Sequence, residues 1–215
     1  MPSRPEAPRD ARDRLRTTAL RGVAAVTGGK HGSPDGQSRW APLILDRDAA
    51  SRLSRDLRLA GGRSMARRRR IVSGSTVASM MMTGLTLFQT GVIAHVPEPG
   101  LPGLDADKVD ASPEAYQFLA TPDAALGLVS YAITVVLAAA GDANRTTSAP
   151  WLPLLLGAKV ALDAAYATKL TIDQGTKHKA VCSWCVVATL ATYSTVPAAV
   201  GEVRDGWRAL RAGAS

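Results

Sequence analysis

The sequence predicts an all-α integral membrane protein, a four-helix bundle preceded by a basic N-terminal arm that is disordered or partly helical. Three features of the 215 residues lead to this fold class. Four long apolar stretches follow one another from residue 71 onward, most of the positive charge lies before them, and the only two cysteines are three positions apart. The average composition, 46% apolar and 20% charged, resembles that of a soluble domain and hides this division.

The apolar stretches are long enough to cross a membrane as helices. A crossing takes about 20 mostly apolar residues, because the hydrocarbon core is about 30 Å thick and an α-helix rises about 1.5 Å per residue. The stretches span residues 71–96, 124–141, 150–170 and 181–201, and the second and fourth contain no charged side chain. Four buried helices of a soluble protein are the alternative, but uncharged runs of about 18 residues or more favour membrane spans.

The third stretch carries charged residues in its middle. Lys159 and Asp163 are four positions apart, so they share one face of the predicted helix. Because unpaired charges are costly in hydrocarbon, we expect the two side chains to pair and to face the interior of the bundle. A structural ion pair and a proton path for redox chemistry are both open interpretations.

Basic residues beside the spans predict which ends of the helices face the cytoplasm. Cytoplasmic loops of membrane proteins carry an excess of Lys and Arg. Arg67–Arg70 precede the first span and Arg145 lies between the second and third, whereas the loop 97–123 is mainly acidic. We therefore expect cytoplasmic N- and C-termini, with loop 97–123 and the start of the fourth span on the outer side of the cell membrane. Lys177 and Lys179, in the second outer loop, run against this rule.

The same patterns set the domain boundaries, which give a basic arm over residues 1–64, a membrane domain over 65–205 and a cytoplasmic tail over 206–215. Residues 1–70 hold 17 of the 26 Lys and Arg residues, and we expect the arm to be disordered. A short amphipathic helix around Leu53 and Leu57, lying on an anionic membrane surface, is an alternative. Nucleic-acid binding is not expected, because the arm lacks interleaved aromatic residues. Translation from Met65, without the arm, is a further alternative.

Cys182 and Cys185 frame the sequence Cys-Ser-Trp-Cys at the start of the fourth span. Their spacing places both sulfurs on one helix face, and the partial positive charge of a helix N-terminus favours a thiolate. At the outer membrane surface such a pair can cycle between dithiol and disulfide. A metal site is not expected, because zinc would need two more ligands. Two structural cysteines packed as small apolar residues are the other alternative.

This arrangement resembles the vitamin K epoxide reductase family, the membrane four-helix thiol oxidoreductases, over roughly residues 71–205. The resemblance rests on the Cys-x-x-Cys that opens the last of four spans and on Pro122-x-Ala124-x-x-Gly127-x-x-x-Tyr131, which opens the second. The loop segment Val109-Asp110-Ala111-Ser112 is similar to a family loop in which a Ser follows a cysteine-bearing segment.

One departure from the family pattern is large. Family members usually carry two more cysteines in the loop between the first two spans, and these shuttle electrons to the membrane pair. Here residues 97–123 contain no cysteine, and Ala106 stands near the position of the second one. Either an external thiol protein reaches Cys182 directly, or the protein has kept the fold and lost turnover.

The resemblance implies a quinone substrate held among the four helices near the outer surface. It implies that Cys185 faces the quinone and that Cys182 exchanges disulfides with the thiol partner. It also implies a quinone site in which Asp123 replaces an amide side chain, Thr189 replaces a tyrosine, and Ser112 lines the rim. Without the resemblance, Asp123 is interpreted as a helix N-cap, Thr189 as bonded to its own helix backbone, and Ser112 as a turn residue.

The predicted function is that of a membrane enzyme coupling a Cys182–Cys185 dithiol and disulfide to reduction of a menaquinone- or ubiquinone-type quinone. We expect it to support disulfide formation in extracytoplasmic proteins through a thioredoxin-like thiol partner. The alternative is a non-catalytic four-helix membrane protein, either a quinone-binding scaffold or a redox sensor, that has lost the electron-shuttle cysteines. A transporter has only Lys159 and Asp163 in its favour.

Overall fold

The structure is a computed structural model that describes residues 45–213. The chain forms two units, Met1–Arg47 and Asp48–Ser215, and the second contains every feature discussed below. The expectation of a disordered arm concerns mainly residues 1–44, which lie outside the described residues. The described part of the arm is helical: α2 (Arg47–Leu59) includes Leu53 and Leu57 and contains no buried residue.

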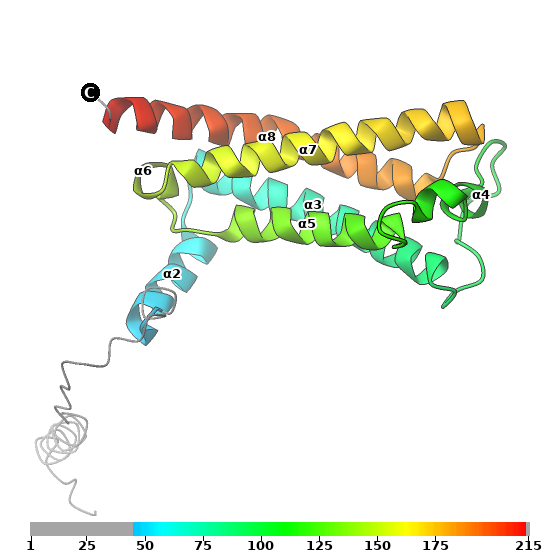
Figure 1. Cartoon of the computed structure of the whole chain (residues 1–215). Coiled ribbons are helices and arrows are strands. Elements are labelled where there is room, and N and C mark those ends of the chain that lie inside the picture. The colour runs from blue at the N-terminus through cyan, green and yellow to red at the C-terminus, as the bar shows by residue number, and fades with distance from the viewer. Residues whose placement is uncertain (1–44, 214–215) are drawn as a thin grey trace, which may run out of the picture. The chain divides into compact units, whose positions relative to one another are not determined.

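Four long helices form the body of the second unit (Figure 1). They are α3 (Arg63–Gln89), α5 (Asp123–Ala139), α7 (Trp151–Asp173) and α8 (Ser183–Gly213). Helix α3 packs against α5 and α8, and α7 also packs against both of these, so the four helices close a ring. The all-α prediction is confirmed for residues 45–213, where the β-pairing is limited to an isolated bridge between Leu104 and Val181.

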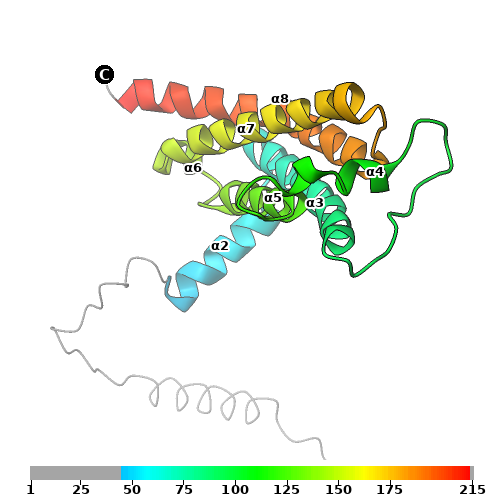
Figure 2. The ribbon, with the colours of Figure 1, turned by 45° about the vertical axis from the view of Figure 1, so that its right-hand side comes forward.

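Short elements connect the long helices. Figure 2 shows α4 (Ala106–Asp110) and the start of α8 at the same end of the bundle, where a wide loop follows α3. A 3-10 helix (Pro113–Tyr116) leads from α4 towards α5, and a single π-helical turn (Gln174–His178) joins α7 to the start of α8. Helix α6 (Arg145–Ser148) lies at the opposite end, near the C-terminus (Figure 1).

The long helices overlap the four predicted stretches but differ from them at their ends. Helix α3 starts at Arg63 and not at residue 71, and it stops at Gln89 because Gly91 takes a positive φ of 76° soon afterwards. Helix α8 continues to Gly213, through the predicted boundary between membrane domain and tail at residue 206. Its polar residues there have partners, since Glu202 pairs with Arg145 and Asp205 with Arg67.

Two of the four helices, α3 and α8, are long and apolar enough to cross a membrane. Helix α5 is also apolar but has only 17 residues, and α7 carries the charges predicted from the sequence. Crossing by all four helices therefore stays a prediction. Each of the four nevertheless exposes large apolar side chains, as expected for contact with lipid; among them are Met80, Leu87, Val129, Ile133, Val136, Leu155, Leu162, Val187 and Leu190.

At the end of the bundle near α6, two buried arginines hold the C-terminus of α5. The Arg68 guanidinium donates to the carbonyl oxygens of residues 138–142, and the Arg145 guanidinium donates to those of residues 137, 138 and 140. Several of these are carbonyls at the end of α5, which a helix end leaves without intrahelical partners, and the others belong to the loop that follows. Glu202, fully buried, accepts a bond from Arg145 Nη2 at 3.2 Å. Arg68 and Arg145, whose charges contributed to the predicted orientation, therefore also have a structural role.

Candidate functional site

The two cysteines lie at the N-terminus of α8, and both are free thiols. The backbone N–H of Cys185 donates to Cys182 Sγ at 3.2 Å, so the sulfur of Cys182 occupies the position of a helix cap. Cys182 is 0% exposed and packs with Leu85, Val96 and Ala106, whereas Cys185 is only partly buried.

Glu98 ties the loop after α3 to the start of α8. Its Oε1 accepts from the Ser183 N–H at 2.6 Å, and its Oε2 accepts from the Ala106 N–H at 2.5 Å. The indole N–H of Trp184 donates to the Pro97 carbonyl at 2.8 Å, and the Val181 N–H donates to the Gly103 carbonyl at 2.9 Å. Residues 97–106 are thus fastened along the segment that carries Cys182. We name residues 97–106 the strap.

Asp110 lies next to the thiol of Cys185. The Cys185 thiol donates to Asp110 Oδ1 at 3.7 Å, while Asp110 Oδ2 has no partner among the described residues. The residue is 5% exposed, and burial is the main reason why the pKa of its carboxyl rises to about 6. Hydrogen bonds from the two thiols act in the opposite direction.

Asp110, Cys182 and Cys185 also form a group whose ligand atoms lie within 4.8 Å of one another. One metal ion could bridge such a group, but a closed zinc site takes four ligands. Within residues 45–213 no fourth His, Cys, Asp or Glu joins this group. The expectation that the protein uses no metal stays a prediction.

Gln89, the last residue of α3, organises the start of α5. Its Nε2 donates to Asp123 Oδ1 at 2.7 Å and to the Asp110 carbonyl at 3.2 Å, and its Oε1 accepts from the Ala124 N–H at 3.2 Å. Pro122 occupies the N-cap position of α5, and the helix has no side-chain cap. The Asp123 carboxylate is therefore held by Gln89, and it also lies next to the first backbone N–H groups of α5.

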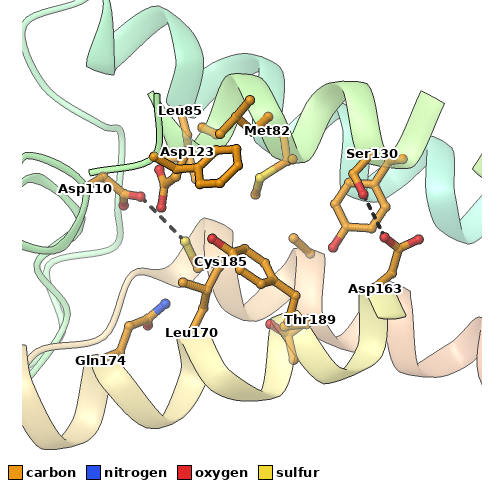
Figure 3. A pocket seen from close by; sticks show the side chains of 18 of the residues that line it. Met82, Leu85, Asp110, Asp123, Ser130, Asp163, Leu170, Gln174, Cys185 and Thr189 are labelled. Atoms are coloured by element: carbon orange, nitrogen blue, oxygen red, sulfur yellow. Dashed lines mark hydrogen bonds between the residues drawn. The ribbon is translucent and has the colours of Figure 1, made fainter. Parts of the chain in front are cut away.

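A cavity of about 320 Å³ lies between α3, α5, α7 and α8, and Cys185 forms part of its wall (Figure 3). Asp123 and Thr189, both predicted to contact a quinone, line this cavity together with Cys185. The Thr189 hydroxyl lies 3.4 Å from the Thr171 hydroxyl, on the neighbouring helix. We name this space the apolar cavity; its lining includes Met82, Leu85, Phe118, Leu126, Tyr131, Leu162, Tyr166, Ala167, Leu170 and Ala188.

Ser112, the third residue predicted to contact a quinone, does not line the apolar cavity. It lines a second space of about 410 Å³, and Cys185 and Asp110 are in the wall of both. We name this second space the polar cavity; its lining includes Ser112, Glu114, Gln117, Lys169, Asp173, Lys177 and His178. Asp123 lines both cavities, whereas Thr189 lines only the apolar cavity and Ser112 only the polar one.

Lys159 and Asp163 pair inside the bundle, as the sequence predicted. Asp163 also accepts from the hydroxyls of Ser130 at 2.8 Å and Thr134 at 2.7 Å, and Lys159 donates to both hydroxyl oxygens. Asp163 reaches the apolar cavity (Figure 3), so the ion pair lies beside this space.

Sequence reasoning missed three residues of this site, namely Gln89, Glu98 and Asp110. Each acts through a contact with a residue far away in the chain, and none belongs to a motif with a fixed spacing. Asp110 stands within the loop segment that carried the family resemblance, which is the only signal that could have singled it out.

Over residues 45–213, the fold and the site define an all-α protein with two neighbouring thiols, one of which, Cys185, lines an apolar cavity. The chain belongs to the vitamin K epoxide reductase family, whose model matches residues 70–200. This match confirms the resemblance inferred from the sequence, and it includes most of all four long helices. Members of the family are in general membrane thiol–quinone oxidoreductases. No curated protein matches the chain.

Proposed function

We propose that this protein is a membrane oxidoreductase in which Cys182 and Cys185 cycle between dithiol and disulfide while a quinone is reduced. The observation that carries the proposal is the position of Cys185, which lies in the wall of the apolar cavity and three residues from a second thiol. A volume of about 320 Å³ is at the lower end of the range for small-molecule sites, which begins at about 300 Å³. Family membership supports the general class of reaction.

The chemistry needs a nucleophilic sulfur, a proton acceptor and a second sulfur. Cys185 adds as a thiolate to an electron-poor carbon of the quinone, and Asp110 Oδ1 accepts its proton. Cys182 then attacks Cys185 Sγ, so that a disulfide bond forms and the carbon–sulfur bond breaks. The electron pair of that bond stays on the ring, which takes up two protons. One quinone and two thiols thereby give one hydroquinone and one disulfide.

Two polar groups in the wall of the apolar cavity are available for the oxygens of a quinone. Gln89 fixes the carboxylate of Asp123, and the Thr189 hydroxyl lies on α8 one turn after Cys185. Thr189 donates directly, whereas Asp123 donates only when it is protonated. Ser112 stands beside the polar cavity, and we assign it to the rim of the site and not to the ring pocket.

The proposed location is the cell membrane, with both termini cytoplasmic and the thiol pair at the extracytoplasmic side. Disulfides persist on that side, and a thioredoxin-like partner there would pass electrons from secreted proteins to the thiol pair. The quinone, of menaquinone or ubiquinone type, would enter from the bilayer, since most of the wall of the apolar cavity belongs to the long helices.

The test is quinone reduction by the purified full-length chain in lipid nanodiscs. Dithiothreitol supplies electrons, menadione accepts them, and the loss of quinone absorbance is followed. We expect turnover that Cys185→Ala abolishes and that Thr83→Ala, on an exposed position of α3, leaves unchanged. The Cys182→Ser/Cys185→Ser double variant measures the uncatalysed reaction. Turnover that survives Cys185→Ala above this background would refute the proposal.

The absence of loop cysteines favours a second candidate, a non-catalytic protein that binds a quinone as a scaffold or redox sensor. That protein would bind menadione, seen as quenching of tryptophan fluorescence, without reducing it. Binding together with a rate no higher than that of the double variant would favour this candidate.

A further inference from the structure

Cys185 is reachable from two sides, and the two sides differ in chemistry. On one side lies the apolar cavity, and on the other the polar cavity of about 410 Å³. Most of the residues that line only the polar cavity are polar or charged. They come from the segment after α4, from the end of α7 and from the π-helical turn that follows it; they include Ser112, Glu114, Gln117, Lys169, Asp173, Lys177 and His178. The two cavities adjoin, because Asp123 and several other residues line both, but only the polar cavity offers a water-soluble reactant a way to Cys185 past charged side chains.

Cys182 has no such access. It is 0% exposed and lines neither cavity. The strap lies along it through the Ser183–Glu98 and Val181–Gly103 bonds, and the Cys182 N–H donates to Gln174 Oε1 at 3.1 Å. A protein thiol that attacked Cys182 Sγ would first have to displace the strap and the apolar side chains around the sulfur.

We propose that the polar cavity binds the thiol co-substrate and that thiol–disulfide exchange takes place at Cys185, with Cys182 as the buried resolving sulfur. This proposal deepens the proposed function and rests on it. The family resemblance assigns the exchange to the first cysteine, which in most members receives electrons from loop cysteines. This chain lacks those cysteines, and it exposes the second cysteine to both cavities.

The exchange balances in atoms and electrons. A thiolate of the dithiol co-substrate attacks Cys185 Sγ of the oxidised pair; the bond between the two protein sulfurs breaks, and Cys182 leaves as a thiolate. The N–H of Cys185 and the N-terminus of α8 stabilise that thiolate. The second thiol of the co-substrate attacks its own sulfur in the mixed disulfide and releases Cys185. The co-substrate loses two electrons and two protons, which the protein pair gains and passes to the quinone.

Asp110 serves both half-reactions, because it lines both cavities and one of its oxygens is free. Oδ1 already accepts from Cys185, and Oδ2 has no partner in the described part of the chain. The incoming thiol can therefore lose its proton to Asp110 at the moment it attacks.

The proposal is tested by trapping mixed disulfides with single-thiol variants of the full chain in nanodiscs. Cys182→Ser keeps only Cys185, and Cys185→Ser keeps only Cys182. The probes are 2,2′-dithiodipyridine and a hexapeptide whose single cysteine is activated with thiopyridine. Because exchange needs access to the sulfur, we expect Cys182→Ser to react at least about tenfold faster than Cys185→Ser. In SDS the two rates should become similar, which controls for intrinsic reactivity.

The two probes distinguish the sources of the thiol. Reaction of Cys182→Ser with both probes indicates a cysteine on a polypeptide, and reaction with the small probe alone indicates a low-molecular-weight thiol. Equal or faster trapping by Cys185→Ser in the folded state would overturn the proposal. This readout does not involve a quinone, so it separates failure of the thiol route from failure of the proposed function.

A second pair of variants tests the two cavities independently. Gln117→Trp fills only the polar cavity, and Leu162→Trp fills only the apolar cavity. We expect Gln117→Trp to raise the KM for dithiothreitol and to leave the single-turnover oxidation of the reduced protein by menadione unchanged. Leu162→Trp should slow the oxidation by menadione and leave the KM for dithiothreitol unchanged. If Gln117→Trp alters the menadione step and leaves the KM for dithiothreitol unchanged, the assignment of the polar cavity is wrong.

Discussion

The thiol of Cys185 donates to Asp110 Oδ1 at 3.7 Å, although 75 residues separate the two in the chain. The pairing places a buried carboxyl next to the sulfur that faces both cavities. Because burial raises the pKa of Asp110 to about 6, the carboxyl is mostly ionised at neutral pH and still binds a proton readily. These are the properties that a proton acceptor for a reacting thiol requires.

Asp110→Asn removes the acceptor and keeps the shape of the side chain. With Asp110 present, quinone reduction should fall as the pH drops through about 6, because the carboxyl then takes up a proton and cannot accept another. The Asn variant should be slower by about 10²-fold at neutral pH and should lose this inflection. The measurement is the pH–rate profile with dithiothreitol and menadione. Asp56→Asn, on an exposed position of α2, is the matched control; an Asn variant that keeps both rate and inflection would exclude the role.

The sequence predicted the long helices because their signal is local. A run of apolar residues of sufficient length indicates a helix wherever it packs, and each predicted stretch overlaps one of the four helices. The errors lie at the ends. Arg67–Arg70 was interpreted as a flank, but it belongs to the first part of α3, since Arg68 turns inward and binds carbonyls at the end of α5. Such a partner cannot be recognised from hydropathy alone.

The site was only partly predictable for a related reason. The Cys-x-x-Cys spacing is local and was found directly, and the family resemblance led to Asp123 and Thr189 at the apolar cavity. Glu98, by contrast, contacts Ser183 across 85 residues, and Gln89 contacts Asp123 across 34. These contacts depend on how the helices pack, and no spacing rule connects their partners. The burial of Cys182 follows from the same packing.

The proposed orientation can be measured with single-cysteine variants in the Cys182→Ser/Cys185→Ser background. Gly100 lies in the strap and Thr147 in α6, at opposite ends of the bundle (Figure 1). We expect a membrane-impermeant maleimide to label Gly100→Cys on intact cells and to label Thr147→Cys only after lysis, since the charge rule places α6 inside. The reverse pattern would place the thiol pair in the cytoplasm and end the proposed electron route.

Gly84 gives α3 room for the indole ring of Trp184. A Cβ at this position would overlap the ring, whose N–H is fixed by the Pro97 carbonyl at 2.8 Å. Gly84→Ala should therefore displace Trp184, loosen the strap and cost about 1–3 kcal/mol of stability. We expect a lower melting temperature and faster labelling of Cys182 in the Cys185→Ser background. Gly175→Ala, where nothing lies within 4 Å, is the control; equal effects of the two substitutions would contradict this interpretation.

Removing one partner of the Lys159–Asp163 ion pair should destabilise the protein strongly, whereas replacing both with apolar residues should change its stability little. Asp163→Asn leaves a buried ammonium without its counter-charge, which typically costs about 3–5 kcal/mol. The double variant Lys159→Met/Asp163→Leu removes both charges and should be close to the unchanged protein. Lys169→Gln breaks an exposed pair with the same spacing, Lys169–Asp173, and should cost less than about 1 kcal/mol. Melting temperatures in nanodiscs decide the order, and a double variant as unstable as Asp163→Asn would contradict the ion-pair argument.

Arg68→Lys tests whether the shape of the guanidinium, and not its charge alone, holds the end of α5. Arg68 donates to the carbonyl oxygens of residues 138–142 through three nitrogens, and a lysine ammonium is a single point that cannot reach them all. At least one carbonyl would stay buried without a donor, so we expect a loss of about 1–3 kcal/mol.

The matched control is Arg70→Lys, two residues away and exposed, which should change stability by no more than about 0.5 kcal/mol. Amide hydrogen exchange adds a local measurement. Exchange at residues 136–142 should accelerate in Arg68→Lys and stay unchanged in Arg70→Lys, because fraying starts where carbonyls lose their donor. If a positive charge at position 68 were sufficient, the two lysine variants would behave alike in both measurements, and the role assigned to the guanidinium would be wrong.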